Sequence, residues 1–251
     1  SKSRPDQAEL NLDRNREFQV MKVAIASSGL GHVSRGVESW ASDLGRALAE
    51  RGVDVILCKG GGVAETDYER VVPCRERGAE STVKLAKRLP KWAWHLGLGS
   101  AVSIEQTSFA LGLIRLLRRE PVDVVHVQDA QLGLLLQYAN RLGILKAKPI
   151  LGHGTNEPAT FLKKFDYVQH LAPHHLESIR EAGAWKPSWT AIPNFIDVRR
   201  FHPGRSDALR EELGVPIDAL VVVCVAAIKR SHKRIDALID DEVRALGETA
   251  E

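Results

Sequence analysis

The chain has 251 residues, 44% of them hydrophobic and 27% charged, and this composition excludes a mainly disordered, collagen-like or coiled-coil protein. Its 35 Lys and Arg against 32 Asp and Glu leave a net charge of +3, too small an excess to indicate a nucleic-acid binder. The three cysteines, Cys58, Cys74 and Cys224, are widely spaced without a CxxC pair. They indicate neither a disulfide framework nor a zinc site, and they favour a reducing compartment, the cytoplasm.

Two stretches bear on targeting. Residues 1–20 mix basic and acidic side chains and contain no apolar segment, which is typical of an N-terminal extension rather than a signal peptide. The nearest candidate for a membrane span, 95–114, is interrupted by Glu105, Gln106 and several Ser and Thr residues. We therefore interpret it as a helix of a soluble domain.

Short apolar runs alternate with amphipathic helical patterns between residues 21 and 192. The predicted strands are 21–27, 53–58, 71–74, 122–127, 148–153, 165–172 and 189–192. The predicted helices follow the loop 28–36, occupy 81–119 with breaks near Pro90 and Gly97–Gly99, and continue at 131–142 and 173–182. This alternation predicts an α/β fold in which a Rossmann-like, doubly wound parallel sheet carries helices on both faces.

The composition changes after residue 192. Residues 193–218 are punctuated by Pro and Gly, which is typical of an interdomain linker. The run 219–227 is fully apolar and predicts a new buried strand, followed by an amphipathic helix. One strand and one helix cannot bury their own apolar faces, so we expect 219–251 to begin a truncated second Rossmann-like domain. A partner chain or a dimer contact could cover it.

Ligands of open parallel sheets bind at the carboxyl ends of the strands, which here carry 27–36, 59–62, 128–129 and 153–157. The first of these loops, SSGLGHVSRG, leads from a strand into a helix, so its backbone amides predict an anion site. Its third Gly comes too late for GxGxxG, and no acidic residue ends the second strand, which disfavours a nicotinamide cofactor. The alternative is a tight turn without a ligand.

Several stretches together resemble family 4 glycosyltransferases. They are GVE (36–38), ALAERGVDV (47–55), VDVVHVQD (122–129), PNFID (193–197) with FHP (201–203), and KRSHKRIDALID (229–240). The resemblance implies a two-domain GT-B enzyme whose first domain binds mostly the acceptor and whose second binds the nucleotide sugar. It implies transfer of a sugar to a hydroxyl acceptor with retained configuration, without a protein-bound metal and with no cofactor beyond the nucleotide-sugar co-substrate.

The resemblance assigns His153 a catalytic role near the donor sugar, and it assigns Gly36 and Lys233 to the donor phosphates. The remaining candidates follow from their place at the carboxyl ends of the strands. They are Gly31 at the donor phosphates, Asp129 as a catalytic residue that could accept the acceptor proton, and Gln128, Thr155 and Asn156 at the acceptor. Two positions depart from the family pattern, because Arg35 stands where an earlier glycine is common and Ala227 where an arginine is usual. The alternatives are structural: His153 caps the following loop, Asp129 caps helix 131–142, and Thr155 and Asn156 shape a turn.

Other histidines predict no metal site, because no carboxylate completes a ligand set with His170, His174 and His175. Segment 84–95 combines four basic residues with Trp92 and Trp94, a combination that suits an anionic membrane surface. Its alternative is a solvated face whose tryptophans pack on the core or line an acceptor cleft. The predicted location is the cytoplasm, with peripheral contact at the inner face of the membrane as a further option.

Two other functions stay open. One is a non-catalytic module that binds an acceptor or a partner, and the other is a different GT-B enzyme, such as a nucleotide-sugar epimerase or a phosphorylase. The family's later Glu-x7-Glu motif does not occur in residues 193–251. We therefore expect this chain alone to turn over poorly.

Overall fold

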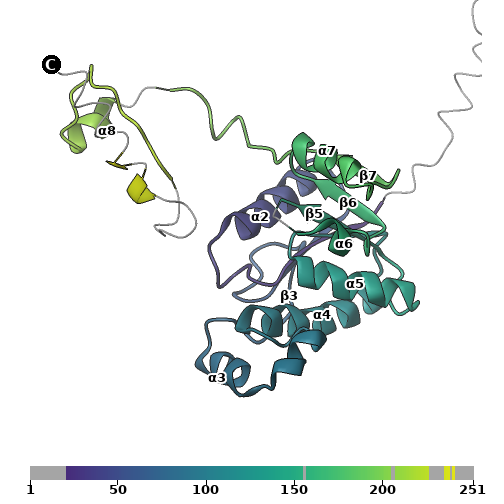
Figure 1. Ribbon diagram of the computed structural model, residues 1–251. Helices are drawn as coiled ribbons and strands as arrows, with labels where there is room; N and C mark the ends of the chain where they lie inside the picture. Colours follow the sequence, from purple (N-terminus) through teal and green to yellow (C-terminus); the bar gives the residue numbers. More distant parts are fainter. Residues whose placement is uncertain (1–20, 155–156, 205–206, 226–234, 238, 241–251) are drawn as a thin grey trace, which may run out of the picture. The chain divides into compact units, whose positions relative to one another are not determined.

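The computed structural model describes residues 21–154, 157–204, 207–225, 235–237 and 239–240. The chain divides into two compact units, Ser1–Phe195 and Ile196–Glu251, and each is described by itself. Among these described residues, the strands all lie in the first unit (Figure 1).

The first unit is built on a seven-stranded sheet in which every neighbouring pair of strands is parallel. The strands are β1 (Val23–Ser27), β2 (Val55–Lys59), β3 (Glu69–Val71), β4 (Val124–Val127), β5 (Lys148–His153), β6 (Tyr167–His170) and β7 (Trp189–Ala191). Their order across the sheet is β3-β2-β1-β4-β5-β6-β7. The chain reverses direction across the sheet between β1 and β4, which is the switch point where such sheets bind ligands. The predicted doubly wound parallel sheet is confirmed.

Helices cover both faces of this sheet. They are α2 (Gly36–Ala49), α3 (Glu80–Arg88), the 3₁₀ helix η1 (Lys91–Leu96), α4 (Ala101–Arg119), α5 (Ala130–Arg141), α6 (Ala159–Leu162) and α7 (Pro173–Glu181). Along β1, Ala24 and Ala26 join the core that contains Phe109 of α4, whereas Ile25 packs with Trp40 of α2. Successive strand residues point to opposite faces, so the two cores lie on opposite sides of the sheet.

The predicted breaks in segment 81–119 are confirmed. Helix α3 ends before Pro90, whose missing amide hydrogen and fixed φ disfavour continuation. The 3₁₀ helix ends at Gly97, which adopts the left-handed conformation at φ 70°. No helix within the described ranges is both long and apolar enough to cross a bilayer.

Two predicted strands are wrong in part. The strand expected at 71–74 lies at Glu69–Val71 instead, because Pro73 cannot donate a hydrogen bond to a neighbouring strand. In the second unit, which contains α8 (Asp207–Glu212), residues 219–225 form no strand. Leu220 and Val225 are 82% and 94% exposed. An apolar run becomes a strand only where other strands pair with it, and the described part of this unit provides none.

Candidate functional site

Four adjacent strands of the sheet place polar residues along one edge. Ser28 follows β1, Asp129 follows β4, His153 ends β5 and His170 ends β6. All four side chains are buried. Buried polar groups need hydrogen-bond partners, and two clusters of side chains meet that need in different ways.

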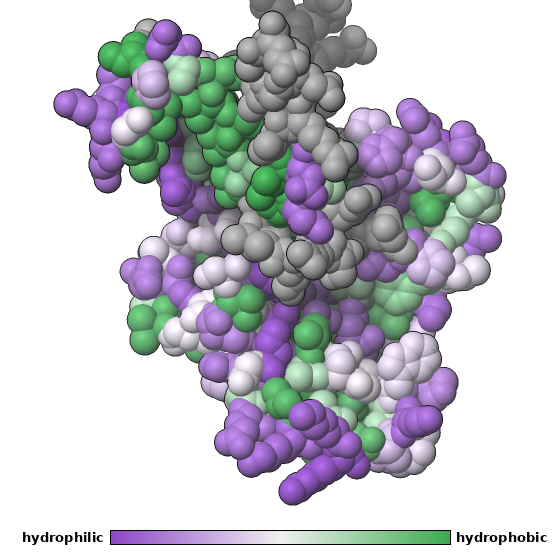
Figure 2. Space-filling view, turned by 60° about the vertical axis from the view of Figure 1, so that its left-hand side comes forward, coloured by the Kyte–Doolittle hydropathy of each residue, from purple (hydrophilic) through white to green (hydrophobic). Residues whose placement is uncertain are grey.

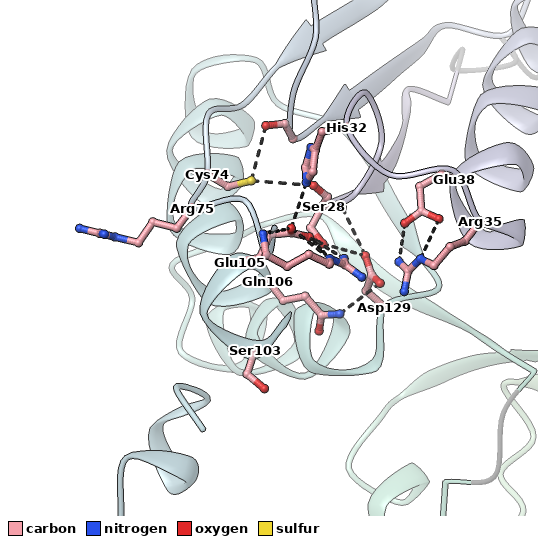
Figure 3. Close-up of polar contacts among 12 residues, drawn as sticks. Ser28, His32, Arg35, Glu38, Cys74, Arg75, Ser103, Glu105, Gln106 and Asp129 are labelled. Atoms are coloured by element: carbon pink, nitrogen blue, oxygen red, sulfur yellow. Dashed lines mark hydrogen bonds and ion pairs between the residues drawn. The ribbon is translucent and has the colours of Figure 1, made fainter. Parts of the chain in front are cut away.

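The first, the Glu105 cluster, comprises Ser28, His32, Arg77, Glu105, Gln106 and Asp129 and lies beneath the loop between β1 and α2. The Glu105 carboxylate, on the inner face of α4, is fully buried at its centre (Figure 3). It accepts hydrogen bonds from Ser28 Oγ at 3.0 Å and from His32 Nε2 at 2.9 Å. It also accepts from the backbone amide of Arg77 at 2.7 Å and from the Arg77 guanidinium at 2.5 and 3.1 Å.

These contacts fix the charge of Glu105. Burial alone raises the pKa of a carboxyl group, but the hydrogen bonds from Arg77 and His32 outweigh it and lower the pKa of Glu105 to about 2. The same carboxylate raises the pKa of Arg77 despite its partial burial. Arg77 and Glu105 are therefore both charged. Their ion pair links the segment before α3 to α4 and to the loop between β1 and α2.

Asp129 holds the same loop from the other side. Its Oδ2 accepts from the Ser28 amide at 3.2 Å, and its Oδ1 accepts from Gln106 Nε2 at 3.1 Å. Ser28 Oγ is also 3.2 Å from Oδ2, yet its single proton can serve only Glu105 or Asp129. Burial raises the pKa of Asp129. The alternative that Asp129 caps helix α5 is wrong, because its side chain makes no capping hydrogen bond.

Gly31 belongs to a contact between two loops. It has φ 98°, and a Cβ atom there would collide with the carbonyl group of Gly61. The Gly61 amide donates to the Leu30 carbonyl at 3.1 Å, and a Cβ on Gly60 would collide with the Ser28 carbonyl. The structure thus gives Gly31 a packing role against loop 60–62, and its contact with donor phosphates stays a prediction.

Gly36 lies in open space at the first residue of α2. No atom lies within 4 Å of a Cβ built on it, and Arg35 makes no side-chain capping bond. The first amides of a helix have no partner within the helix and carry a partial positive charge. Arg35 forms an ion pair with the buried Glu38 (Figure 3). The geometry at Gly36 is therefore compatible with the predicted anion site.

The second, the histidine cluster, comprises His153, His170 and His175 with Glu157. His153 Nδ1 lies 3.0 Å from His170 Nδ1, so one ring donates and the other accepts. His153 Nε2 faces a Glu157 oxygen at 3.3 Å, and the His175 ring lies 5.3 Å from that of His153. Burial, with the neighbouring rings of His153 and His175, lowers the pKa of His170 to about 4, and burial with neighbouring histidines lowers the pKa of His175.

This cluster leaves polar atoms without hydrogen bonds. His170 Nε2, His175 Nδ1 and the Gln128 side-chain amide nitrogen are buried, and no hydrogen-bond partner is seen for them. Such groups are the ones that a bound hydroxyl would satisfy. Of the other predicted residues, Thr155, Asn156 and Lys233 lie outside the described residues.

Sequence reasoning missed most of the Glu105 cluster. Glu105 and Gln106 were recognised only as polar interruptions of an apolar helix. A charged residue on the inner face of such a helix signals a buried partner, because an unpaired buried charge is costly. Arg77, between two predicted elements, carried no comparable signal.

Metal ligation has no geometric support in this part of the chain. Among the described residues, no group of three or more His, Cys, Asp or Glu side chains could hold a metal ion.

Several solved structures are similar to this chain. Sucrose-phosphate synthase from Thermosynechococcus elongatus matches with a TM-score of 0.56 at 14% identity, covering 79% of this chain and 53% of its own. UDP-N-acetylglucosamine 2-epimerase from Rickettsia bellii matches with a TM-score of 0.49 at 15% identity, covering 78% of this chain and 52% of its own. HepE from Anabaena, in complex with UDP and glucose, matches with a TM-score of 0.48 at 12% identity, covering 77% of this chain and 50% of its own.

The chain thus spans about half the length of these structures. No curated protein matches it in sequence. The family model described as Glycosyltransferase Family 4 matches residues 34–200, which include α2, the Glu105 cluster apart from Ser28 and His32, and the histidine cluster. The chain therefore belongs to glycosyltransferase family 4, and its first unit is the Rossmann-like layer of a GT-B fold.

Proposed function

We propose that the protein transfers a sugar from a nucleotide-sugar donor to a hydroxyl acceptor with retained configuration. The observation that carries this proposal is the row of buried polar groups along the carboxyl edge of the sheet, beside an open helix N-terminus. Family membership supports the reaction class. The geometry supports the division of roles that follows.

The amino end of α2 is proposed to face the departing diphosphate. The bond between the anomeric carbon and the phosphate oxygen breaks, so negative charge grows on that oxygen. Free amides at Gly36 and the helix dipole stabilise such charge, and the absence of a side chain at Gly36 allows close approach. We assign Lys233 to the same phosphates on the basis of the family pattern alone.

The histidine cluster is proposed to position the sugar and the acceptor. Nδ1 of His153 is used in the hydrogen bond with His170. This bond fixes the plane of the His153 ring and directs its Nε2 toward Glu157. A substrate hydroxyl there can donate to one ring nitrogen or accept from another. The Gln128 amide, with Thr155 and Asn156, would bind further acceptor hydroxyls.

Asp129 is proposed to act through the loop that it holds. Both of its oxygens already accept hydrogen bonds from Ser28 and Gln106. In the proposed step the acceptor oxygen bonds to the anomeric carbon on the face that the phosphate leaves, and the acceptor proton passes to the departing phosphate oxygen. No protein carboxylate needs to take that proton.

The test is a single-turnover assay with protein in excess over radiolabelled UDP-, GDP- and ADP-sugars and a panel of hydroxylated acceptors. We expect labelled product from one donor, with the donor's anomeric configuration by NMR, and about a 100-fold lower rate for His153→Ala. The exposed His95→Ala is the matched control. Inverted product, or epimerised donor formed without acceptor, would contradict the proposal.

A further inference from the structure

A short exposed segment, the 3₁₀ helix η1, follows helix α3. In η1, every side chain is exposed except that of Ala93. Trp92, Trp94 and Leu96 are 63%, 69% and 58% exposed. The alternative that these tryptophans pack on the core is therefore wrong, whereas the alternative that they line an acceptor cleft is not tested by their exposure. We call residues 91–96 the tryptophan turn.

Apolar area of a tryptophan ring that is exposed to water is unfavourable, and contact with another apolar surface removes that area from water. Of the five Trp residues in the chain, two stand in this one turn. The ring of Trp94 lies against Gly99, whose missing side chain leaves room for it. Indole rings favour the boundary between water and lipid headgroups, where the ring is apolar and its N–H stays hydrated.

The neighbouring helix adds positive charge. On α3, Lys84, Lys87 and Arg88 are exposed at a spacing that places them on one face, and Lys91 follows at the start of the turn. The sequence has no acidic residue between Glu80 and Glu105, and Glu105 is fully buried. The outer surface of this segment therefore carries one sign of charge, apart from the Glu80–Lys84 ion pair.

Contacts with α4 and α5 hold the tryptophan turn next to the candidate site. The Gly97 carbonyl accepts from Thr107 Oγ1 at 2.8 Å, and Gly97 also lies against Gln131 in the first turn of α5. Thr107 follows Gln106, and Gln131 follows Asp129 by two residues. In Figure 1, α3 lies at the lower end of the first unit, and Figure 2 shows hydrophilic side chains gathered at that end.

We propose that the tryptophan turn and the basic face of α3 dock on an anionic lipid bilayer. Interfacial tryptophans beside a face on which basic residues outnumber acidic ones are the combination that binds such a surface. Docking there would bring the carboxyl edge of the sheet, with Gln106 and Asp129, next to the headgroups. This inference does not depend on the reaction proposed above.

The experiment is vesicle binding by the full chain. Vesicles of phosphatidylcholine alone are compared with vesicles containing phosphatidylglycerol, at low and high salt. We expect binding to the anionic vesicles only, weakened by salt, and quenching of tryptophan fluorescence by lipids brominated on their acyl chains. Bromine quenching should disappear in the Trp92→Ser/Trp94→Ser variant.

Matched variants test whether vesicle binding depends on this surface rather than on any exposed tryptophan or any exposed basic residue. Trp92→Ser/Trp94→Ser and Lys84→Gln/Lys87→Gln should each weaken binding about tenfold or more. Trp185→Ser, at an exposed indole elsewhere, and Arg118→Gln/Arg119→Gln, at exposed basic residues of α4, should leave it unchanged. Circular dichroism checks that each variant folds.

Three results would overturn the proposal. The first is equal binding to neutral and anionic vesicles, or none to either. The second is anionic binding that the control variants weaken as much as the turn variants do. The third is a dimer in gel filtration that Trp92→Ser/Trp94→Ser dissociates, with no vesicle binding, which would make the turn a contact between copies.

Discussion

The Glu105 cluster and the histidine cluster lie at the same edge of one sheet but differ in how many of their buried polar atoms have hydrogen-bond partners. Around Glu105, donors from Ser28, His32 and Arg77 surround one carboxylate, and a guanidinium neutralises its charge. Among the described residues of this cluster, His32 Nδ1 is the buried side-chain atom for which no partner is seen. Around His153, one hydrogen bond of 3.0 Å joins the rings of His153 and His170, and nitrogens of His170 and His175 are buried with no hydrogen-bond partner seen. A satisfied cluster stabilises the loop above it, whereas an unsatisfied cluster provides atoms for a ligand.

The largest expected effect comes from breaking the satisfied cluster. Glu105→Gln removes the negative charge facing Arg77 and should lower the free energy of unfolding by about 3 kcal/mol. Urea denaturation measures it. The exposed Glu76→Gln, in the same segment, should change stability by less than about 0.5 kcal/mol. An equal loss in the two variants would mean that Glu105 is not the centre of this cluster.

The histidine cluster should respond to acid. The pKa of His170 is about 4 in the folded protein and 6.5 ordinarily, so its neutral form stabilises the fold above pH 6.5. That contribution, at most about 3 kcal/mol, is lost as the pH falls from 6.5 to 4, because the unfolded chain binds the proton first.

Denaturation at a series of pH values measures this slope. His170→Asn should flatten it between pH 6.5 and 4, whereas the exposed His95→Asn should leave it unchanged. Glu105 acts at lower pH, since its contribution is present above its ordinary value of 4.5 and is lost toward its folded pKa of about 2. A wild-type slope in His170→Asn would contradict the burial of a neutral imidazole.

The two loop glycines should differ in stability. Gly31→Ala forces a side chain onto the Gly61 carbonyl at a positive φ and should cost about 2 kcal/mol. Gly36→Ala enters open space and should change stability by less than about 0.5 kcal/mol. Thermal denaturation compares them. A stable Gly31→Ala variant would remove the contact between the two loops.

The smallest expected change in stability comes from two glutamine side chains, one with a hydrogen bond and one for whose amide nitrogen none is seen. Gln106→Leu removes a hydrogen bond to Asp129 and should cost about 1 kcal/mol. Gln128→Leu removes an amide nitrogen for which no bond is seen, and should change stability by roughly 0.5 kcal/mol or less. Equal losses would show that Gln128 has a structural partner.

Sequence patterns predicted the sheet well because its central strands β1, β2 and β4 are buried on both faces and read as continuous apolar runs. They also placed His153 and Asp129 together at the carboxyl edge, since the carboxyl ends of parallel strands share one side. They failed at 219–225, where hydrophobicity alone cannot supply neighbouring strands. They missed the Glu105–Arg77 pair, because pairing across distant segments depends on the fold and leaves no local spacing.

The most direct test of whether this edge binds the reacting sugar is NMR of the full chain with labelled amides and histidine rings. A nucleotide sugar that supports transfer should shift the first amides of α2 at Gly36 and the ring nitrogens of His153. The opposite edge of the sheet serves as an internal control, with its cavity of about 440 Å³ near Val122 and Ile144. Shifts confined to that cavity, with Gly36 and His153 unmoved, would contradict the proposed site.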